Sequence, residues 1–323
     1  MRAEVRRLEL TAMSVVGAYH WRMTIPEERL EAAVVVALRG TASIKKLSPS
    51  EVRAALEEGR NPVEVLRESA DLVAQLADFD SPLDDAQKEI VNWREAGLDV
   101  MFSFNERYPR PLLQVYDYPP VIFGRGTHAN DFDAIAIVGS RVASTKSLNL
   151  ARALGRRLAI ERVTVVSGLA RGIDTAAHLG ALEAGGRTVA VLGQGAGTPI
   201  YPKENAALAR QILSEEGQTL SQFWPGSSPT KQTFPIRNVT MSGLSAVTAI
   251  VDAAEQSGTR HQAAAAVRHG RRVLLHESVV RQTSWGNDLV EKGLAEPFIG
   301  EDDGVELALQ ILRTTSSAGA VFA

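Results

Sequence analysis

Three turns of small, polar and cationic residues follow three apolar runs of the chain, and their chemistry suits the binding of phosphate. The turns are Gly139-Ser140-Arg141, Ser167-Gly168 and Gly193-Gln194-Gly195. Glycine permits a tight turn, backbone N–H groups at a helix start favour an anion, and a guanidinium is a bidentate donor. We therefore expect these turns to form an anion-binding crevice.

A second group of candidate residues spans Lys231 to Asn238 and combines a cation, an aromatic ring, a guanidinium and an amide. A single-stranded nucleic acid needs these parts: charge for its phosphates, a ring for stacking and an amide for base edges. The alternative is that Phe234 is a core residue and that Arg237 pairs with a carboxylate of the sheet.

The elements that must position these residues alternate between strand-like and helical patterns from residue 132 to residue 300. Runs such as 135–138 and 189–192 are continuously apolar, which is typical of strands covered on both faces. This alternation predicts an α/β fold, an extended Rossmann-like, doubly wound and mostly parallel sheet. Ligands of such sheets bind beyond the carboxyl ends of the strands, so the three turns should converge. The predicted strands are 134–138, 163–167, 188–192, 246–251 and 272–275, and the predicted helices are 148–160, 174–184, 205–213, 234–244 and 262–269.

The sequence on either side of this domain predicts smaller structural segments. Residues 1–84 should form a helical accessory domain, in which Ser48 caps one helix and 64–76 form another. Residues 85–131 should form a connector with an edge strand. Residues 132–300 are the Rossmann-like domain. Residues 301–323 should form an acidic C-terminal helix, ending near Leu312, and a small-residue tail.

Composition limits the function classes. The 323 residues include 35 Lys and Arg against 38 Asp and Glu, a net charge of −3, so a local patch must hold any anionic ligand. The absence of cysteine excludes disulfides and thiolate chemistry. The apolar runs are shorter than the roughly 18 residues of a membrane span, and the N-terminus is charged. We therefore expect a cytoplasmic protein without a membrane partner.

Enzyme and cofactor signatures are not found in the sequence. The glycines do not match the dinucleotide fingerprint, and the phosphate-loop pattern of nucleoside triphosphatases is missing. Asp174 is placed to cap a helix, which we favour over a catalytic base. His178, His261, His269 and His276 lack metal-ligand spacing. We expect no catalysis, no cofactor and no metal.

A series of motifs in chain order, within residues 85–300, resembles the DNA-processing protein A family (DprA, also called Smf). The longest motif is the block from Ser167 to His178, which contains Ser-Gly-Leu-Ala-Arg-Gly-Ile-Asp. The other matching segments are Val138–Arg141, Gly180–Gly186, Ala190–Gly193, Tyr201–Asn205, Phe234–Asn238, Gly243–Ser245, Ser257–Thr259 and Gly286–Leu289.

The resemblance implies a homodimeric single-stranded DNA-binding protein that protects incoming strands and loads a RecA-type recombinase during natural transformation. Phe234 would stack on a base and Asn238 would contact the strand. The N–H groups of Ser140, Ser167 and Gly168 would hold phosphates. The full set of implied phosphate-binding residues is Gly139, Ser140, Arg141, Ser167, Gly168, Arg171, Gly172, Lys203, Lys231 and Arg237.

Several positions depart from the family pattern. Val239 stands where a second arginine is usual, and Gln222 stands where an acid is common. We expect Arg260 to restore a positive charge nearby. These departures favour a divergent paralogue, from a mobile element or a defence cassette.

Two alternative functions stay open at this point. One is a nucleotide sensor of a defence or mobile-element system, with a small nucleotide in the same crevice; the missing arginine at Val239 favours it. The other is a nucleoside-monophosphate phosphoribohydrolase. Its glycine-rich loop resembles Gly193 to Thr198 only superficially, since no proline precedes that segment and no glutamate is in register.

Overall fold

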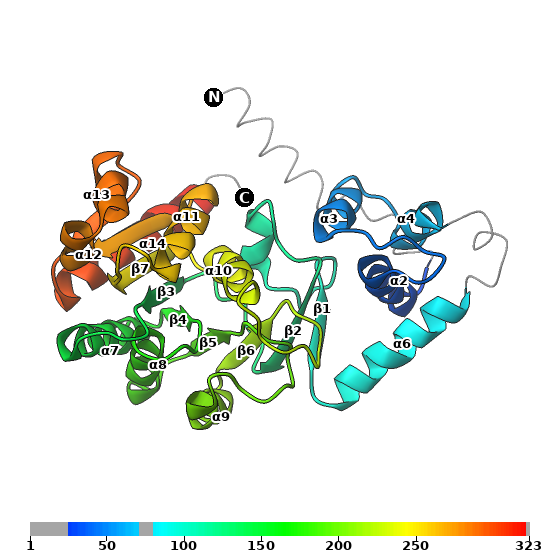
Figure 1. Ribbon diagram of the computed structural model, residues 1–323, viewed down its shortest axis with the longest axis horizontal. Helices are drawn as coiled ribbons and strands as arrows, with labels where there is room; N and C mark the ends of the chain where they lie inside the picture. Colours follow the sequence, from blue (N-terminus) through cyan, green and yellow to red (C-terminus); the bar gives the residue numbers. More distant parts are fainter. Residues whose placement is uncertain (1–24, 71–79, 321–323) are drawn as a thin grey trace. The chain divides into compact units, whose positions relative to one another are not determined.

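The computed structural model describes residues 25–70 and 80–320, which form two compact units (Figure 1). The first unit comprises Met1–Asn105 with Pro119–Val121, and the second comprises Glu106–Tyr118 with Ile122–Ala323. The described elements of the first unit are α2 (Glu27–Arg39), α3 (Pro49–Glu57), α4 (Pro62–Ser69), α6 (Asp80–Glu95) and β1 (Asp99–Phe102).

The helices of the first unit begin where the sequence offers caps. The hydroxyl of Ser48 accepts a hydrogen bond from the backbone N–H of Glu51, and the backbone N–H of Ser48 donates to the Glu51 carboxylate, which completes a capping box. Asn61 caps α4, which ends at Ser69 and not at residue 76 as predicted, because Ala70 turns into an antiparallel bridge with Ile44. Residues 71–76 of that predicted helix lie outside the described part of the chain.

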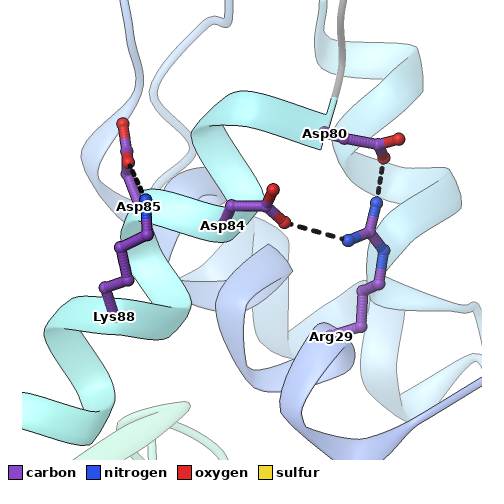
Figure 2. A network of polar contacts seen from close by, with 5 residues as sticks. All are labelled: Arg29, Asp80, Asp84, Asp85 and Lys88. Atoms are coloured by element: carbon purple, nitrogen blue, oxygen red, sulfur yellow. Dashed lines mark hydrogen bonds and ion pairs between the residues drawn. The ribbon is translucent and has the colours of Figure 1, made fainter.

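Charged side chains join α2 to α6 on the surface of the first unit. Arg29 pairs with Asp80 and, at 3.3 Å, with Asp84, while Lys88 pairs with Asp85 at 3.3 Å (Figure 2). Most of these side chains are more than half exposed. Exposed pairs of this kind contribute little to stability.

The strands of the second unit form a twisted sheet in the order β2-β6-β5-β4-β3-β7-β8-β9. Strand β2 runs antiparallel to β6, and all the other neighbours in this order are parallel. The bounds are β2 (Val121–Gly126), β3 (Ala134–Gly139), β4 (Thr164–Ser167), β5 (Thr188–Val191), β6 (Gln218–Ser221), β7 (Val247–Asp252), β8 (Arg272–His276) and β9 (Glu296–Phe298).

Helices cover both faces of this sheet. Ile135 and Val247 point into one apolar core with α7, α8 and α14, whereas Thr248 points the other way and meets Gln262 of α11. The predicted doubly wound, mostly parallel α/β fold and the N-terminal helical region are therefore confirmed. The helices are α7 (Thr145–Ile160), α8 (Ile173–Glu183), α9 (Ala206–Ser214), α10 (Thr233–Leu244), α11 (Gly258–Arg268), α12 (Glu277–Gln282), α13 (Ser284–Glu291) and α14 (Glu301–Ala320), with 3-10 turns η2 (Arg110–Gln114) and η3 (Lys203–Asn205).

The C-terminal helix differs from its prediction. α14 runs from Glu301 to Ala320, so residues expected as a tail after Leu312 continue the helix. Its apolar residues Val305, Ala308 and Ile311 enter the core beside β8 and β9, and this packing anchors the helix. Among the described helices, none combines the length and the apolar character needed to cross a bilayer.

Candidate nucleic-acid interface

The carboxyl ends of β5, β4 and β3 lie side by side, because these strands are parallel neighbours. The turns that start at Gly139, Gly168 and Gly193 therefore meet at one edge of the sheet, as predicted. The first turns of α10 reach the same edge. A Cβ on Gly193 would come within 2.8 Å of the Phe234 ring, and a Cβ on Gly168 would overlap the guanidinium of Arg237.

At this edge the exposed Arg141 and Tyr201 lie in contact with the half-buried Phe234, and we name these three side chains the rim. The guanidinium carbon of Arg141 lies 5.0 Å from the centroid of the Phe234 ring. The Tyr201 ring lies on Phe234 at 5.9 Å between centroids and an interplanar angle of 43°. A guanidinium stacked on a ring keeps its in-plane N–H donors available for a phosphate. The rim thus offers a cation beside aromatic surface.

Asp174, His178 and Arg237 are buried, and the charge of Arg237 acts on the pKa of the other two; we name these three side chains the inner layer. Arg237 is 5% exposed. Its Nη1 donates to the carbonyl oxygens of Gly168 at 2.5 Å and Val191 at 2.7 Å, so it braces the ends of β4 and β5. Arg237 is therefore buried, but it is bonded to backbone carbonyls and not to the sheet carboxylate of the structural alternative, and its contact with phosphate stays a prediction.

Asp174 does not cap α8, which corrects the sequence prediction. The residue before α8 is Gly172, which has no side chain to cap it. The Oδ2 of Asp174 instead accepts the N–H groups of Gly168 at 3.1 Å and Ala170 at 3.3 Å. Burial raises the pKa of the Asp174 carboxyl, and the nearby positive charge of Arg237 opposes that shift. Burial also lowers the pKa of Arg237.

His178 is the third member of the inner layer and is completely buried. Its Nδ1 lies 2.6 Å from the hydroxyl of Thr188, and that hydroxyl donates to the carbonyl of Val165 at 2.7 Å. The Nδ1 must therefore carry the proton and donate. Burial, with a contribution from the charge of Arg237, lowers the pKa of His178 to about 3, so the ring is neutral at physiological pH.

The backbone cradle expected from the sequence is not open in this structure. The N–H of Ser140 donates to the carbonyl of Asp252 at 2.9 Å, and the N–H of Gly168 donates to Asp174. The hydroxyl of Ser167 is buried and donates to a carbonyl of β3 at 2.7 Å. The turns use the N–H groups of Ser140 and Gly168 as internal donors, so a phosphate would compete with these bonds, and the contact of Ser140, Ser167 and Gly168 with phosphate stays a prediction.

The glycines of these turns allow close packing. Gly172 has a φ of 76°, and a Cβ there would overlap the carbonyl oxygen of Ser140. A Cβ on Gly139 would come within 2.6 Å of the Ile173 side chain. Gly139 and Gly172 therefore hold the turn after β3 against the start of α8, and their contact with DNA stays a prediction.

The other predicted cations are exposed, but one of them is paired with a carboxylate. Arg171, Lys203, Lys231 and Arg260 are all exposed. Arg171 pairs with Glu204 at 2.6 Å, so a phosphate would compete with that carboxylate.

The family departures lie near α10. Thr240 donates its hydroxyl to the side chain of Gln222, which gives this amide a structural partner. Val239 is half-buried. Asn238 donates to the carbonyl of Gly258 at 3.4 Å and so joins the starts of α10 and α11, where Arg260 lies. That Arg260 restores the positive charge missing at Val239 remains a prediction.

Tyr201 is the rim residue that sequence reasoning missed as a site residue. It belongs to one of the matching motifs, but nothing in its spacing showed that its ring would lie on Phe234. The available signal was an aromatic residue placed between a strand-end turn and Lys203.

The other three histidines without metal-ligand spacing take structural or surface positions. His269 bonds Asp117 at 2.7 Å, His276 lies 3.0 Å from the carbonyl of Ile299, and His261 is exposed. Within residues 25–70 and 80–320, no three His, Asp or Glu side chains gather as a metal ion would require.

Comparison with protein families gives a match over the domain just described. The model of the family described as DNA recombination-mediator protein A matches residues 99–308. Protein Smf of Escherichia coli is 41% identical over 170 residues, covering 52% of this chain and 45% of that protein. DNA processing protein DprA of Streptococcus pneumoniae is 35% identical over 198 residues, covering 60% of this chain and 69% of that protein.

Two solved structures share the fold. DNA processing protein A from Helicobacter pylori, described for its unique single-stranded DNA binding mode, has a TM-score of 0.58 at 24% identity, covering 66% of this chain and 96% of its own. DprA from Streptococcus pneumoniae has a TM-score of 0.57 at 24% identity, covering 94% of this chain and 96% of its own.

Proposed function

Since this chain belongs to the DNA recombination-mediator protein A family, we propose that it binds single-stranded DNA at the rim and acts without catalysis as a recombination mediator. The observation that carries the proposal is the guanidinium of Arg141 over the ring of Phe234, 5.0 Å from its centroid, at the carboxyl ends of β3 and β5. Cations and aromatic faces at one edge suit the alternating phosphates and bases of a single strand.

The proposed role of each residue follows from how far its side chain is buried. Arg141 contacts a phosphate, with Lys203 and Lys231 adding charge, and the half-buried Phe234 offers its ring to a base. Stacking and phosphate contacts are nearly blind to base identity, so sequence preference should be weak. The relative from Helicobacter pylori, described by its single-stranded DNA binding mode, supports the choice of ligand.

We extend the proposal to the cellular role that the family implies. The protein forms a homodimer in the cytoplasm, covers incoming single strands and passes them to a RecA-type recombinase. Co-purification of a RecA-type recombinase on an immobilised complex of this protein with DNA tests the partner, and its absence from the complex would contradict it.

The DNA proposal is tested by fluorescence anisotropy with a labelled oligothymidine across a salt series. We expect affinity to fall with salt, and Arg141→Ala to weaken binding about tenfold, the loss expected for one charged hydrogen bond. The slope of log affinity against log salt should fall by about 0.7 for each phosphate that the variant no longer neutralises.

Arg272→Ala is the matched control, because Arg272 is an exposed arginine at the opposite, amino end of β8. It should bind like the wild type. Absence of binding by the wild type, or an equal loss in both variants, would contradict the proposal. Saturable binding of a small nucleotide that excludes DNA would replace it with the nucleotide-sensor function.

A further inference from the structure

We propose that Tyr201 is a base-stacking residue of this edge, so that the rim presents two aromatic rings to successive bases of a single strand. This inference rests on the proposed function and deepens it. Tyr201 is 49% exposed, although it carries one of the larger apolar surfaces in the unit. A large ring left open beside a cationic site has surface to offer a ligand.

The backbone on both sides of Tyr201 is anchored by buried groups. The Gln194 side chain is 1% exposed; its Nε2 donates to the carbonyl of Pro199 at 2.8 Å and its Oε1 accepts the N–H of Tyr201 at 3.3 Å. Asn205, also buried, donates to the carbonyl of Leu169 at 2.8 Å. The segment is thus fixed before and after Tyr201, while the ring itself is left at the surface.

The two rings of the rim differ in what covers them. Phe234 touches the Gly193 backbone along one edge and carries the guanidinium of Arg141 on its ring. Tyr201 is in contact with Phe234, and no cation–π partner of Tyr201 occurs among the described residues. A base that reaches Phe234 must share or displace Arg141, whereas Tyr201 offers a more open face. We therefore assign the first stacking contact to Tyr201.

One cation contacts this pair of rings and another lies close by in the chain. Arg141 lies on the Phe234 side, and the exposed Lys203 follows Tyr201 by two residues in the chain. Two rings in contact, with a cation over one of them and a second cation two residues along the chain from the other, suit a strand whose phosphates and bases alternate. Since every nucleobase has a π-face, the contact accepts any base.

The test separates stacking from phosphate binding with two labelled probes, an oligothymidine and an abasic deoxyribose-phosphate strand of equal length. Tyr201→Ala should weaken oligothymidine binding about tenfold, in the range of one base stack. The same variant should bind the abasic strand as tightly as the wild type does, since that strand has no base to stack. Tyr201→Phe should bind both probes like the wild type, because the ring is kept.

Two further variants make the outcome decisive. Arg141→Ala should weaken the binding of both probes, because both carry phosphates. Tyr116→Ala should weaken neither: Tyr116 has the same 49% exposure but packs on His269, near the other end of α10. Unchanged oligothymidine binding in Tyr201→Ala, with Arg141→Ala impaired, would overturn the role of Tyr201 and leave the proposed function standing. No binding by the wild type would overturn both.

Discussion

Charged side chains of the inner layer and of the protein surface follow opposite rules. Arg237 is almost inaccessible and donates to the carbonyls of Gly168 and Val191. Arg141, at the same edge, is exposed and lies on an aromatic ring. The contrast teaches that two arginines expected to share one role differ in burial: Arg237 is a structural brace, whereas the guanidinium of Arg141 stays accessible for the proposed phosphate contact.

The largest effect that tests this contrast is expected from Arg237→Met. The change leaves two buried carbonyl groups without a donor and Asp174 without its nearby positive charge, which should cost about 3 kcal/mol of unfolding free energy. Urea denaturation measures it. Arg141→Ala should change the unfolding free energy by less than about 0.5 kcal/mol. Equal unfolding free energies of the two variants would contradict the distinction between a structural Arg237 and an exposed Arg141.

A pH dependence sharpens the description of the inner layer. The pKa of His178 is about 3 in the folded protein against an ordinary 6.5, so between these values the unfolded chain binds a proton that the folded protein does not. The contribution of His178 to the stability is therefore complete above pH 6.5 and falls as the pH decreases toward 3, by up to about 1.4 kcal/mol per pH unit.

The variant His178→Asn removes that titration and keeps an amide donor toward Thr188. Its unfolding free energy, measured by urea denaturation from pH 7 to pH 5, should fall less steeply than that of the wild type. Parallel pH profiles for the two proteins would show that His178 titrates normally in the folded state.

A small effect is also expected at the surface of the first unit. Arg29→Ala removes the pairs with Asp80 and Asp84, all partly or largely exposed (Figure 2). The loss should be about 0.5 kcal/mol and should shrink in high salt, because water and ions already screen these charges. A loss as large as that of Arg237→Met would contradict the rule that burial determines how much an arginine contributes to the unfolding free energy.

The strands and the convergence of their turns could be predicted because continuous apolar runs and small residues are local signals. The inner layer could not. Arg237 reaches a carbonyl 69 residues earlier in the chain, and no spacing reveals which arginine turns inward. The same holds for Asp174, whose position suggested a cap although its carboxylate serves the turn before α8. The domain boundaries and the assignment of residues to DNA contacts stay predictions.

The most direct test of the rim is photocrosslinking of an oligonucleotide that carries 5-bromodeoxyuridine, followed by mass spectrometry of the attached peptides. We predict attachment to the peptides that contain Tyr201 or Phe234, and its loss when unlabelled oligothymidine competes. Attachment confined to peptides away from the carboxyl ends of β3, β4 and β5 would contradict the placement of single-stranded DNA at this edge.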